Sequence, residues 1–230
     1  MKTLGIIGGT GYPSTIEYYR LINEQVNERL GGLNFARCIV YSFNYGDIDA
    51  LNWQQNMEGL FKLISEAVDT LIVAGAEGIL LGANTIHMFA DRLQEQIPVP
   101  IIHIADTTGD AILTKGLRKV ALLGTRHTME MDFYRTRLQY KQIEVLIPEA
   151  GEREFIHKSI LDELVKNIFT PETKNQYLDI ITSLEQKGAE GIILGCTEIP
   201  LLVEQKDCSI PLFDTLKIHA NAAVDFIVND

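Results

Sequence analysis

The sequence predicts an α/β protein with two pseudosymmetric halves, each a mostly parallel sheet flanked by helices. Three observations support this prediction. Short apolar segments alternate with helical patterns along the chain, which is the rhythm of a parallel sheet. This order restarts near residue 120. The segment Gly-Ile-Ile-Leu-Gly-Cys-Thr-Glu at 191–198 also repeats Gly-Ile-Leu-Leu-Gly-Ala-Asn-Thr at 78–85, which lies 113 residues earlier.

The first half is read from its apolar spacing and its helix-start residues. Pro13 with Ser14 or Thr15 marks the start of a helix, because these residue types are favoured there. Apolar residues at helical spacing over 55–74 indicate a second helix. The expected strands are residues 4–7, 38–43, 79–82 and 101–104, and the expected helices run from Pro13 to about Arg29, over 55–74, and from the end of the third strand to about Gln96.

The second half repeats this order. Gly9-Thr10 and the later Glu17-Tyr18-Tyr19-Arg20 match Gly124-Thr125 and Asp132-Phe133-Tyr134-Arg135 at an offset of 115, which supports an internal duplication. The expected strands are residues 120–124, 143–147, 192–195 and 212–213, and the expected helices are 129–139, 153–167, 172–187 and 214–228. We expect two domains, residues 1–104 plus 212–230 and residues 105–211, with the crossover near 105–118.

The charge and the cysteine content restrict the class of partner. A net charge of −11 argues against a nucleic-acid partner, since phosphates require a basic face. No apolar run approaches the roughly 18 residues that span a membrane, and the first residues are too short for a signal-peptide core. Cys38, Cys196 and Cys208 are an odd number of cysteines without export signals. Reduced thiols in the cytoplasm, with no membrane partner, are therefore expected.

Chemistry is expected at the carboxyl ends of the strands, where open parallel sheets bind ligands. The loop at 8–11 either holds an anion with its backbone N–H groups or is only a tight turn. Cys196 lies near an expected helix start, where the dipole favours a thiolate, although a lone cysteine is more often a buried hydrophobic residue. An isolated histidine such as His87 is more often a packing or capping residue than a functional one. No Cys/His spacing predicts a metal site.

Motifs spread over nearly the whole chain carry a family resemblance. They are Gly8-Gly9 with Ser14-Thr15 and Tyr18-Tyr19, Ser42-Phe43-Asn44, Ala83-Asn84-Thr85-Ile86-His87, Leu123-Gly124-Thr125-Arg126, Glu163-Leu164-x-Lys166, Leu194-Gly195-Cys196-Thr197-Glu198-Ile199-Pro200, and Phe213-Asp214-Thr215. Together they resemble the aspartate/glutamate racemase family, which uses no cofactor. The resemblance implies two pseudosymmetric α/β halves with the active site in the cleft between them, and it implies a homodimer.

The resemblance also implies an activity, the racemisation of an acidic amino acid, aspartate or glutamate, by thiol-based proton transfer at Cα. In the family, one thiolate removes the Cα proton and a second thiol delivers a proton to the opposite face. The matching positions here are Cys196 and residue 83. A thiolate close to a cation and helix starts is expected to have a lowered pKa. By the resemblance, the substrate-binding residues are Gly9, Thr10, Asn84, Thr85, Thr125, Lys166 and Thr197, supported by Ser42, Asn44, His87 and Glu198.

The sequence departs from the family pattern in two places. Ala83 stands where the pattern Cys-Asn-Thr-x-His has a catalytic cysteine, and a methyl group cannot carry a proton. Either Ala83 was engineered in place of a cysteine, or the chain is a natural one-cysteine member. No basic residue occurs between Arg37 and Lys62, where some aspartate-specific members carry an arginine. Two alternative functions stay open: a one-thiol decarboxylase of the arylmalonate type, and a catalytically inactive protein that binds an amino acid.

Overall fold

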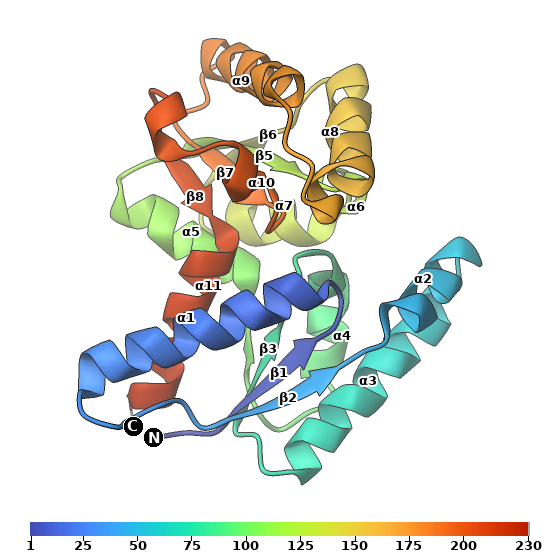
Figure 1. Ribbon diagram of the computed structural model, residues 1–230, viewed down its shortest axis with the longest axis vertical. Helices are drawn as coiled ribbons and strands as arrows, with labels where there is room; N and C mark the ends of the chain where they lie inside the picture. The colour runs from blue at the N-terminus through green and yellow to red at the C-terminus, as the bar shows by residue number, and fades with distance from the viewer. Residues whose placement is uncertain (230) are drawn as a thin grey trace. The chain divides into compact units, whose positions relative to one another are not determined.

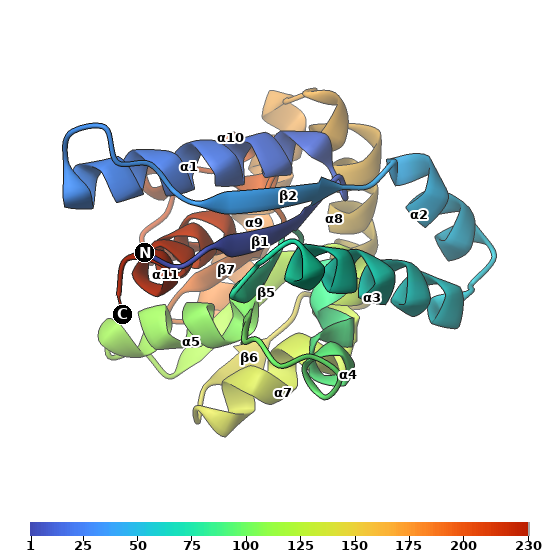
Figure 2. The same cartoon turned by 90° about the horizontal axis from the view of Figure 1, so that it is seen from below.

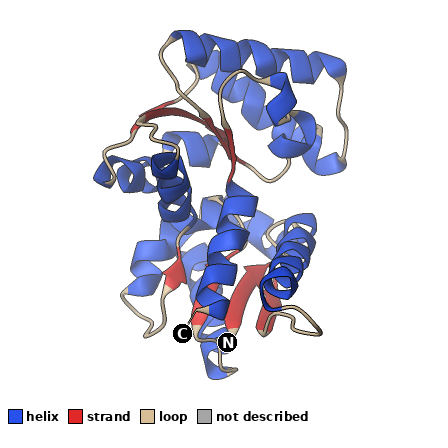
Figure 3. Cartoon of the chain, turned by 90° about the vertical axis from the view of Figure 1, so that its left-hand side faces the viewer, coloured by secondary structure: helices blue, strands red, loops and turns tan. Residues whose placement is uncertain are grey.

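The computed structural model describes residues 1–229 and divides them into two compact units. Unit 1 contains residues 1–104 together with the C-terminal segment from His219, and unit 2 contains Ala105–Ile218. Each unit has its own four-stranded parallel sheet flanked by helices (Figure 1). The strands, drawn in red in Figure 3, gather into one sheet in each unit. The predicted fold class is therefore confirmed.

Unit 1 has the strand order β2-β1-β3-β4, with all neighbouring strands parallel. Its elements are β1 (Leu4–Gly8), α1 (Tyr12–Leu30), β2 (Cys38–Ser42), α2 (Tyr45–Trp53), α3 (Met57–Val73), β3 (Gly78–Leu81), the 3₁₀ helix η1 (Thr85–Phe89), α4 (Ala90–Gln94), β4 (Ile101–Ile102) and the larger part of α11 (Thr215–Val228).

The core of unit 1 forms because β1 is apolar on both faces. Leu4, Ile6 and Ile7 are fully buried, as expected for a central strand of a parallel sheet. Helices α1 and α3 cover opposite faces of this strand (Figure 2). The helical spacing that predicted a helix over 55–74 places its apolar side chains on the inner face of α3, where Leu60, Phe61, Ile64, Ala67, Val68 and Leu71 are buried.

Unit 2 repeats the same topology with the strand order β6-β5-β7-β8, again all parallel. Its elements are α5 (Ile104–Thr114), β5 (Lys119–Gly124), α6 (Arg126–Glu130), α7 (Asp132–Tyr140), β6 (Glu144–Leu146), α8 (Ala150–Asp162), η2 (Leu164–Lys166), α9 (Pro171–Gln186), β7 (Ile192–Gly195), α10 (Ile199–Leu202), η3 (Gln205–Asp207) and β8 (Leu212–Asp214).

Several helices differ from the expectation. The segment 104–114, expected within a connection, is the helix α5, and α2 precedes α3 where no helix was expected. The chain returns to unit 1 inside α11, between Ile218 and His219, whereas the sequence placed this return at residue 212. The structural reason is that β8 pairs with β7 in the sheet of unit 2. Within residues 1–229, none of the helices combines the length and hydrophobicity needed to cross a bilayer.

The carboxyl ends of β1, β2 and β3 are tied together by backbone hydrogen bonds beyond the strands. The N–H of Phe43 donates to the carbonyl of Gly8 at 3.1 Å, and the N–H of Gly82 donates to the carbonyl of Ile7 at 2.8 Å. Gly9 follows directly with a φ of 78°, and a Cβ there would lie 2.3 Å from the backbone N and O of Phe43. Only glycine fits this junction, because both the conformation and the space exclude a side chain.

Replacing Gly9 by alanine is expected to destabilise unit 1 by about 3 kcal/mol or more, the combined effect of positive φ and overpacking. Gly31→Ala is the matched control, since Gly31 has a φ of 70° and no heavy atom lies within 4 Å of the position that a Cβ would take there. That control is expected to cost about 1–3 kcal/mol and less than Gly9→Ala, from the conformation alone, because φ 70° with ψ 179° is a region that essentially only glycine adopts. Urea unfolding monitored by circular dichroism measures both. Equal losses in the two variants would contradict the tight junction at Gly9.

Candidate active site

The strand ends of unit 1 bring most of its predicted site residues to one edge of the sheet. Gly9 and Thr10 follow β1, Ser42 closes β2 and is followed by Asn44, and Ala83 follows β3. Ala83 is half-buried and Asn84 is buried. The edge is thus formed by small and neutral polar residues.

Two of these residues already have structural roles in unit 1. The N–H of Gly9 donates to the hydroxyl of Thr15 at 2.9 Å, so this group of the loop is committed to the start of α1. The side chain of Asn44 caps α2, accepting from the N–H of Gly46 at 3.4 Å. The loop at 8–11 therefore acts at least in part as a tight turn, which was one of its two interpretations.

Three histidines and a tyrosine form a buried group behind Ala83 in unit 1. His87 lies 4.9 Å from His103 and 5.4 Å from His219, measured between ring centroids. The His87 Nδ1 is 2.8 Å from the carbonyl oxygen of Ala83, so Nδ1 carries the proton and donates. The Nε2 of His219 donates to the carbonyl of Ile102 at 2.7 Å. We call these residues, with Tyr18, the histidine cluster.

Two members of the histidine cluster, His87 and His219, are uncharged at neutral pH. Burial lowers the pKa of His87 to about 3, with a further contribution from His103. Burial likewise lowers the pKa of His219 to about 3, with His87 adding to the effect. Because the proton of His219 is on Nε2, its Nδ1 accepts the hydroxyl of Tyr18 at 2.9 Å. His87 thus supports the backbone at position 83, consistent with the packing role expected for it.

The strand ends of unit 2 place a thiol beside the predicted substrate-binding threonine. Gly124 of β5 pairs with Gly195 of β7, so Thr125 and Cys196 are the next residues on neighbouring strands. A Cβ on Gly195 would lie 2.8 Å from the carbonyl oxygen of Leu123, so glycine permits the close pairing. The hydroxyls of Thr125 and Thr128 lie 3.1 Å apart.

Cys196 forms a thiol–carboxylate pair with Glu198. Its Sγ lies 2.9 Å from Glu198 Oε2, and the hydroxyl of Thr197 donates to the same oxygen at 2.7 Å. Burial raises the pKa of the Cys196 thiol well above its ordinary value, and the charge of Glu198 and the hydrogen bond to it raise the pKa further. Backbone hydrogen bonds of Glu198 and Thr197 act in the opposite direction but are smaller.

The expectation of a lowered pKa at Cys196 is therefore wrong. Burial and a neighbouring anion outweigh the helix start, since α10 begins only at Ile199 and has four residues. Glu198 was expected only to support the site. The sequence contained one signal for its closer role, namely an acidic residue two positions after a cysteine at a strand end.

Lys166 lies on η2 with its side chain exposed, and within residues 1–229 it forms no ion pair. Asn167 follows in the left-handed conformation, with a φ of 58°, and turns the chain. Leu164 is buried in the core cluster against which Cys196 also packs. Lys166 is thus anchored to the core of unit 2 by its own short helix while its ammonium group is accessible to an anion.

The structure also has a concave region on α3. That region has a volume of about 450 Å³ and is lined by Asn56, Glu58, Gly59, Phe61, Lys62, Ser65 and Glu66. It contains none of the predicted site residues. Three or more His, Cys, Asp or Glu residues arranged to hold a metal ion do not occur within residues 1–229.

Two parallel α/β units with a thiol at a strand end are the features of an amino-acid isomerase, as the family resemblance predicted. The chain belongs to the Asp/Glu/Hydantoin racemase family, whose model matches residues 7–223. It is 44% identical to a Yersinia pestis protein described as a candidate Asp/Glu racemase, with a TM-score of 0.95 over 100% of both chains. An aspartate racemase homologue from Pyrococcus horikoshii is 37% identical, with a TM-score of 0.85 over 99% of both chains. The broad specificity amino-acid racemase RacX of Bacillus subtilis is 22% identical over 96% of each chain.

Replacing Glu198 by glutamine is expected to lower the pKa of Cys196, because the substitution keeps an acceptor but removes the negative charge. Alkylation of Cys196 by iodoacetamide at pH 7 should become several-fold faster, since the thiolate is the reactive form. The Cys196→Ser chain gives the background from Cys38 and Cys208. A slower or unchanged alkylation of the Glu198→Gln variant would contradict the thiol–carboxylate pair.

The histidine cluster is expected to make unit 1 sensitive to acid. His87 and His219 have a folded-state pKa below the unfolded value of about 6.5. As the pH falls below 6.5, the unfolded chain binds protons that the folded chain does not, so stability is lost progressively down to about pH 3.

This effect can be isolated with His219→Gln, which retains an N–H for the carbonyl of Ile102. Each such histidine contributes a slope of about 1.4 kcal/mol per pH unit. Between pH 6 and pH 4 the stability of this variant should therefore fall less steeply than that of the parent. Urea unfolding across this range measures the difference, and parallel curves would contradict a neutral cluster.

Proposed function

We propose that this chain catalyses cofactor-independent proton transfer at the Cα of an acidic amino acid, aspartate or glutamate, with Cys196 as the acid/base. The observation that carries the proposal is the contact between Cys196 Sγ and Glu198 Oε2 at 2.9 Å, at the carboxyl end of β7. Membership of the Asp/Glu/Hydantoin racemase family supports it. The Cα–H bond is very weakly acidic, so both a base and a stabilised carbanion are required.

Glu198 gives the thiol a proton acceptor within hydrogen-bond distance. In the deprotonating direction the carboxylate takes the proton from Sγ, and the resulting thiolate takes the proton from Cα while the bonding pair stays on carbon. In the protonating direction these transfers reverse. The hydroxyl of Thr197, 2.7 Å from the same carboxylate oxygen, stabilises the charged form of Glu198.

The carboxylates of the substrate need preorganised donors, since negative charge develops next to them as the proton leaves. We assign this role to the residues that the resemblance selected. They are Gly9, Thr10, Asn84 and Thr85 in unit 1, and Thr125, Lys166 and Thr197 in unit 2, with Ser42, Asn44 and His87 holding the surrounding backbone. The N–H of Gly9 is not available as a donor, because it is bonded to Thr15. Gly9 instead allows the loop to pass close to the backbone of Phe43.

Ala83 determines how far the reaction proceeds. Inversion at Cα requires a proton donor on the face opposite to the base, and the methyl group of Ala83 has no proton to give. The chain with Ala83 is therefore expected to exchange the Cα proton with solvent on one face faster than it racemises. The missing second thiol is also the observation that favours the second candidate, a one-thiol decarboxylase of the arylmalonate type.

The decisive experiment follows Cα by proton NMR in D₂O with L- and D-aspartate and L- and D-glutamate, and follows handedness by chiral chromatography. Cys196→Ser should abolish deuterium exchange. Ala83→Cys should raise racemisation by about 100-fold or more, the range attributed to a positioned acid/base group.

Three outcomes would overturn the proposal. Unchanged exchange in a folded Cys196→Ser variant removes the thiol from the reaction. Amino-acid binding without exchange, even after Ala83→Cys, indicates a catalytically inactive binding protein. Release of CO₂ from a disubstituted malonate, with no exchange at an amino-acid Cα, indicates the decarboxylase.

A further inference from the structure

A dicarboxylic substrate carries a second carboxylate that requires its own cation. Unit 1 has no basic residue between Arg37 and Lys62, so the loop after β2 cannot supply one. Lys166 of unit 2 provides a single ammonium group, which suits one carboxylate. The second cation must therefore come from another strand end, and unit 2 carries an arginine at the end of its central strand β5.

Arg126 is the second residue after β5, directly following Thr125. Gly124 and Gly195 pair at the ends of β5 and β7, which lie about 5 Å apart, and Thr125 and Cys196 directly follow them. An extended arginine side chain covers that distance. Arg126 is thus a basic residue that follows the strand β5, which pairs with the strand that precedes Cys196.

Arg126 and Cys196 also lie toward the same face of the sheet, the face covered by α8 and α9. The guanidinium of Arg126 forms an ion pair with Glu154 of α8. Cys196 packs against the core cluster that contains Ile156 of α8 and Tyr177 of α9. It is near enough to Tyr177 to contribute to the raised pKa of that hydroxyl, after burial. The hydroxyl of Tyr177 is itself 3.0 Å from Ser159 Oγ of α8.

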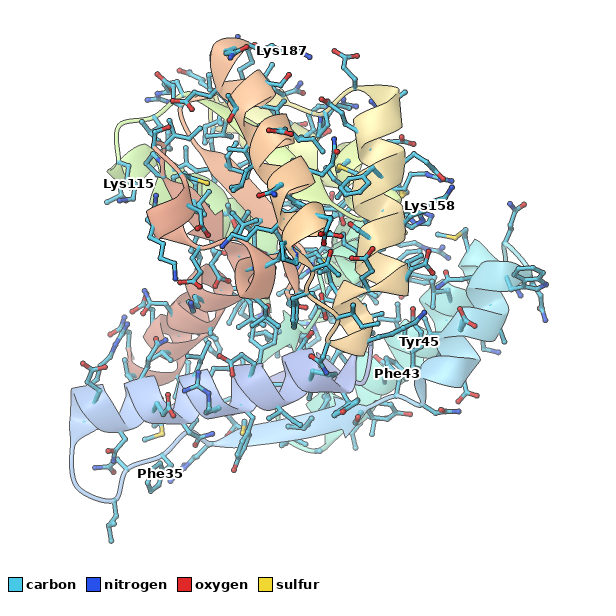
Figure 4. All side chains as sticks on the ribbon, turned by 45° about the horizontal axis from the view of Figure 1, so that its top comes forward. Phe35, Phe43, Tyr45, Lys115, Lys158 and Lys187 are labelled. Atoms are coloured by element: carbon cyan, nitrogen blue, oxygen red, sulfur yellow. The ribbon has the colours of Figure 1, made fainter. Side chains whose placement is uncertain are left out.

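The ion pair of Arg126 with Glu154 is one that an incoming anion can replace. About half of each side chain is exposed, and exposed pairs contribute little stability, typically below about 1 kcal/mol. Glu154 also contacts Lys158 at 3.3 Å, so it keeps a cationic partner if Arg126 turns away. Lys158 projects from α8 (Figure 4). The backbone N–H of Arg126 is bonded to His157 Nδ1 at 3.4 Å, which holds the start of α6 while the side chain moves.

From this arrangement we infer that Arg126 is a specificity-determining residue, which binds the side-chain carboxylate of a dicarboxylic amino acid in exchange for Glu154. The inference rests on the proposed function and names its substrate class. A guanidinium presents two parallel N–H groups to a carboxylate, which a lysine cannot do. Arg126 and Lys166 together provide one cation for each of the two carboxylates. When the amino acid has a neutral side chain, Arg126 keeps its ion pair with Glu154.

The test compares aspartate, glutamate and alanine as substrates for Cα deuterium exchange, with half-saturation concentrations as the readout. Arg126→Gln should raise the half-saturation concentration about tenfold or more for one or both dicarboxylic amino acids, because they lose a charge-assisted hydrogen bond. For alanine, which has no side-chain carboxylate, the increase should be less than twofold. Arg126→Lys should give an intermediate value. Glu154→Gln should lower the half-saturation concentration of the dicarboxylic substrates, because the carboxylate that competes for Arg126 is removed.

The matched control is Arg153→Gln. Arg153 is adjacent in sequence to Glu154, but its side chain pairs with Glu130, at 2.8 Å. This change should leave the preference for aspartate over alanine unaltered. Equal effects of Arg126→Gln on all three substrates, or no effect on any, would overturn the inference.

Failure of the proposed function gives a different result. If no variant exchanges any Cα proton, the role of Arg126 can still be tested by calorimetry. The binding of aspartate and alanine is measured for the Cys196→Ser variant and for the double variant that also carries Arg126→Gln. A loss of aspartate binding that depends on Arg126 supports the inference without catalysis, and binding that is independent of Arg126 refutes it. Circular dichroism establishes that each variant is folded.

Discussion

Parallel strand pairing is the constraint on which both sets of strand-end residues depend. All strands of a parallel sheet present their carboxyl ends at one edge, where their loops can act together. In unit 1 the hydrogen bonds from Phe43 to Gly8 and from Gly82 to Ile7 continue the ladder into the loops. In unit 2 the pairing of Gly124 with Gly195 sets Thr125 beside Cys196. Backbone bonds, and not contacts between the side chains, therefore fix where these strand-end residues lie.

The charge state of the thiol follows from burial and from one carboxylate. A nucleophilic cysteine usually needs a lowered pKa, but a residue that moves a proton in both directions needs a donor state as well as a base state. With Glu198 2.9 Å away and the pKa raised, Cys196 rests as the thiol, which is the donor state in the proposed reaction. Its base form becomes accessible by passing a proton to Glu198, and the hydroxyl of Thr197 favours the return of that proton because it stabilises the charged form of Glu198. The pair thus serves a reversible transfer better than an isolated thiolate would.

The sequence predicted β1, β3, β5 and β7 well because each is a short buried run with a glycine at its end or directly after it. It predicted α3 from apolar spacing, whereas α2 has a single buried residue, Ile48, and so no periodic pattern. The helix α5 was missed because its first turns contain Thr-Thr-Gly, residues of low helix propensity. The pKa of Cys196 could not be predicted, since it depends on side-chain burial and on the rotamer of Glu198, which no sequence pattern encodes.

The two units share a strand order but differ in what lies behind the third strand of each sheet. Behind Ala83, the histidine cluster is buried, and the hydrogen bonds of the neutral His87 and His219 run to backbone carbonyls and a tyrosine. Beside Cys196, the acceptor is the carboxylate of Glu198. A methyl group backed by uncharged rings can shape a site but cannot titrate within it. Introducing a thiol at position 83 would therefore place it next to the backbone carbonyl that His87 holds and not next to a carboxylate. The two thiols of such a variant would have unequal acidities even though the strands that carry them are equivalent.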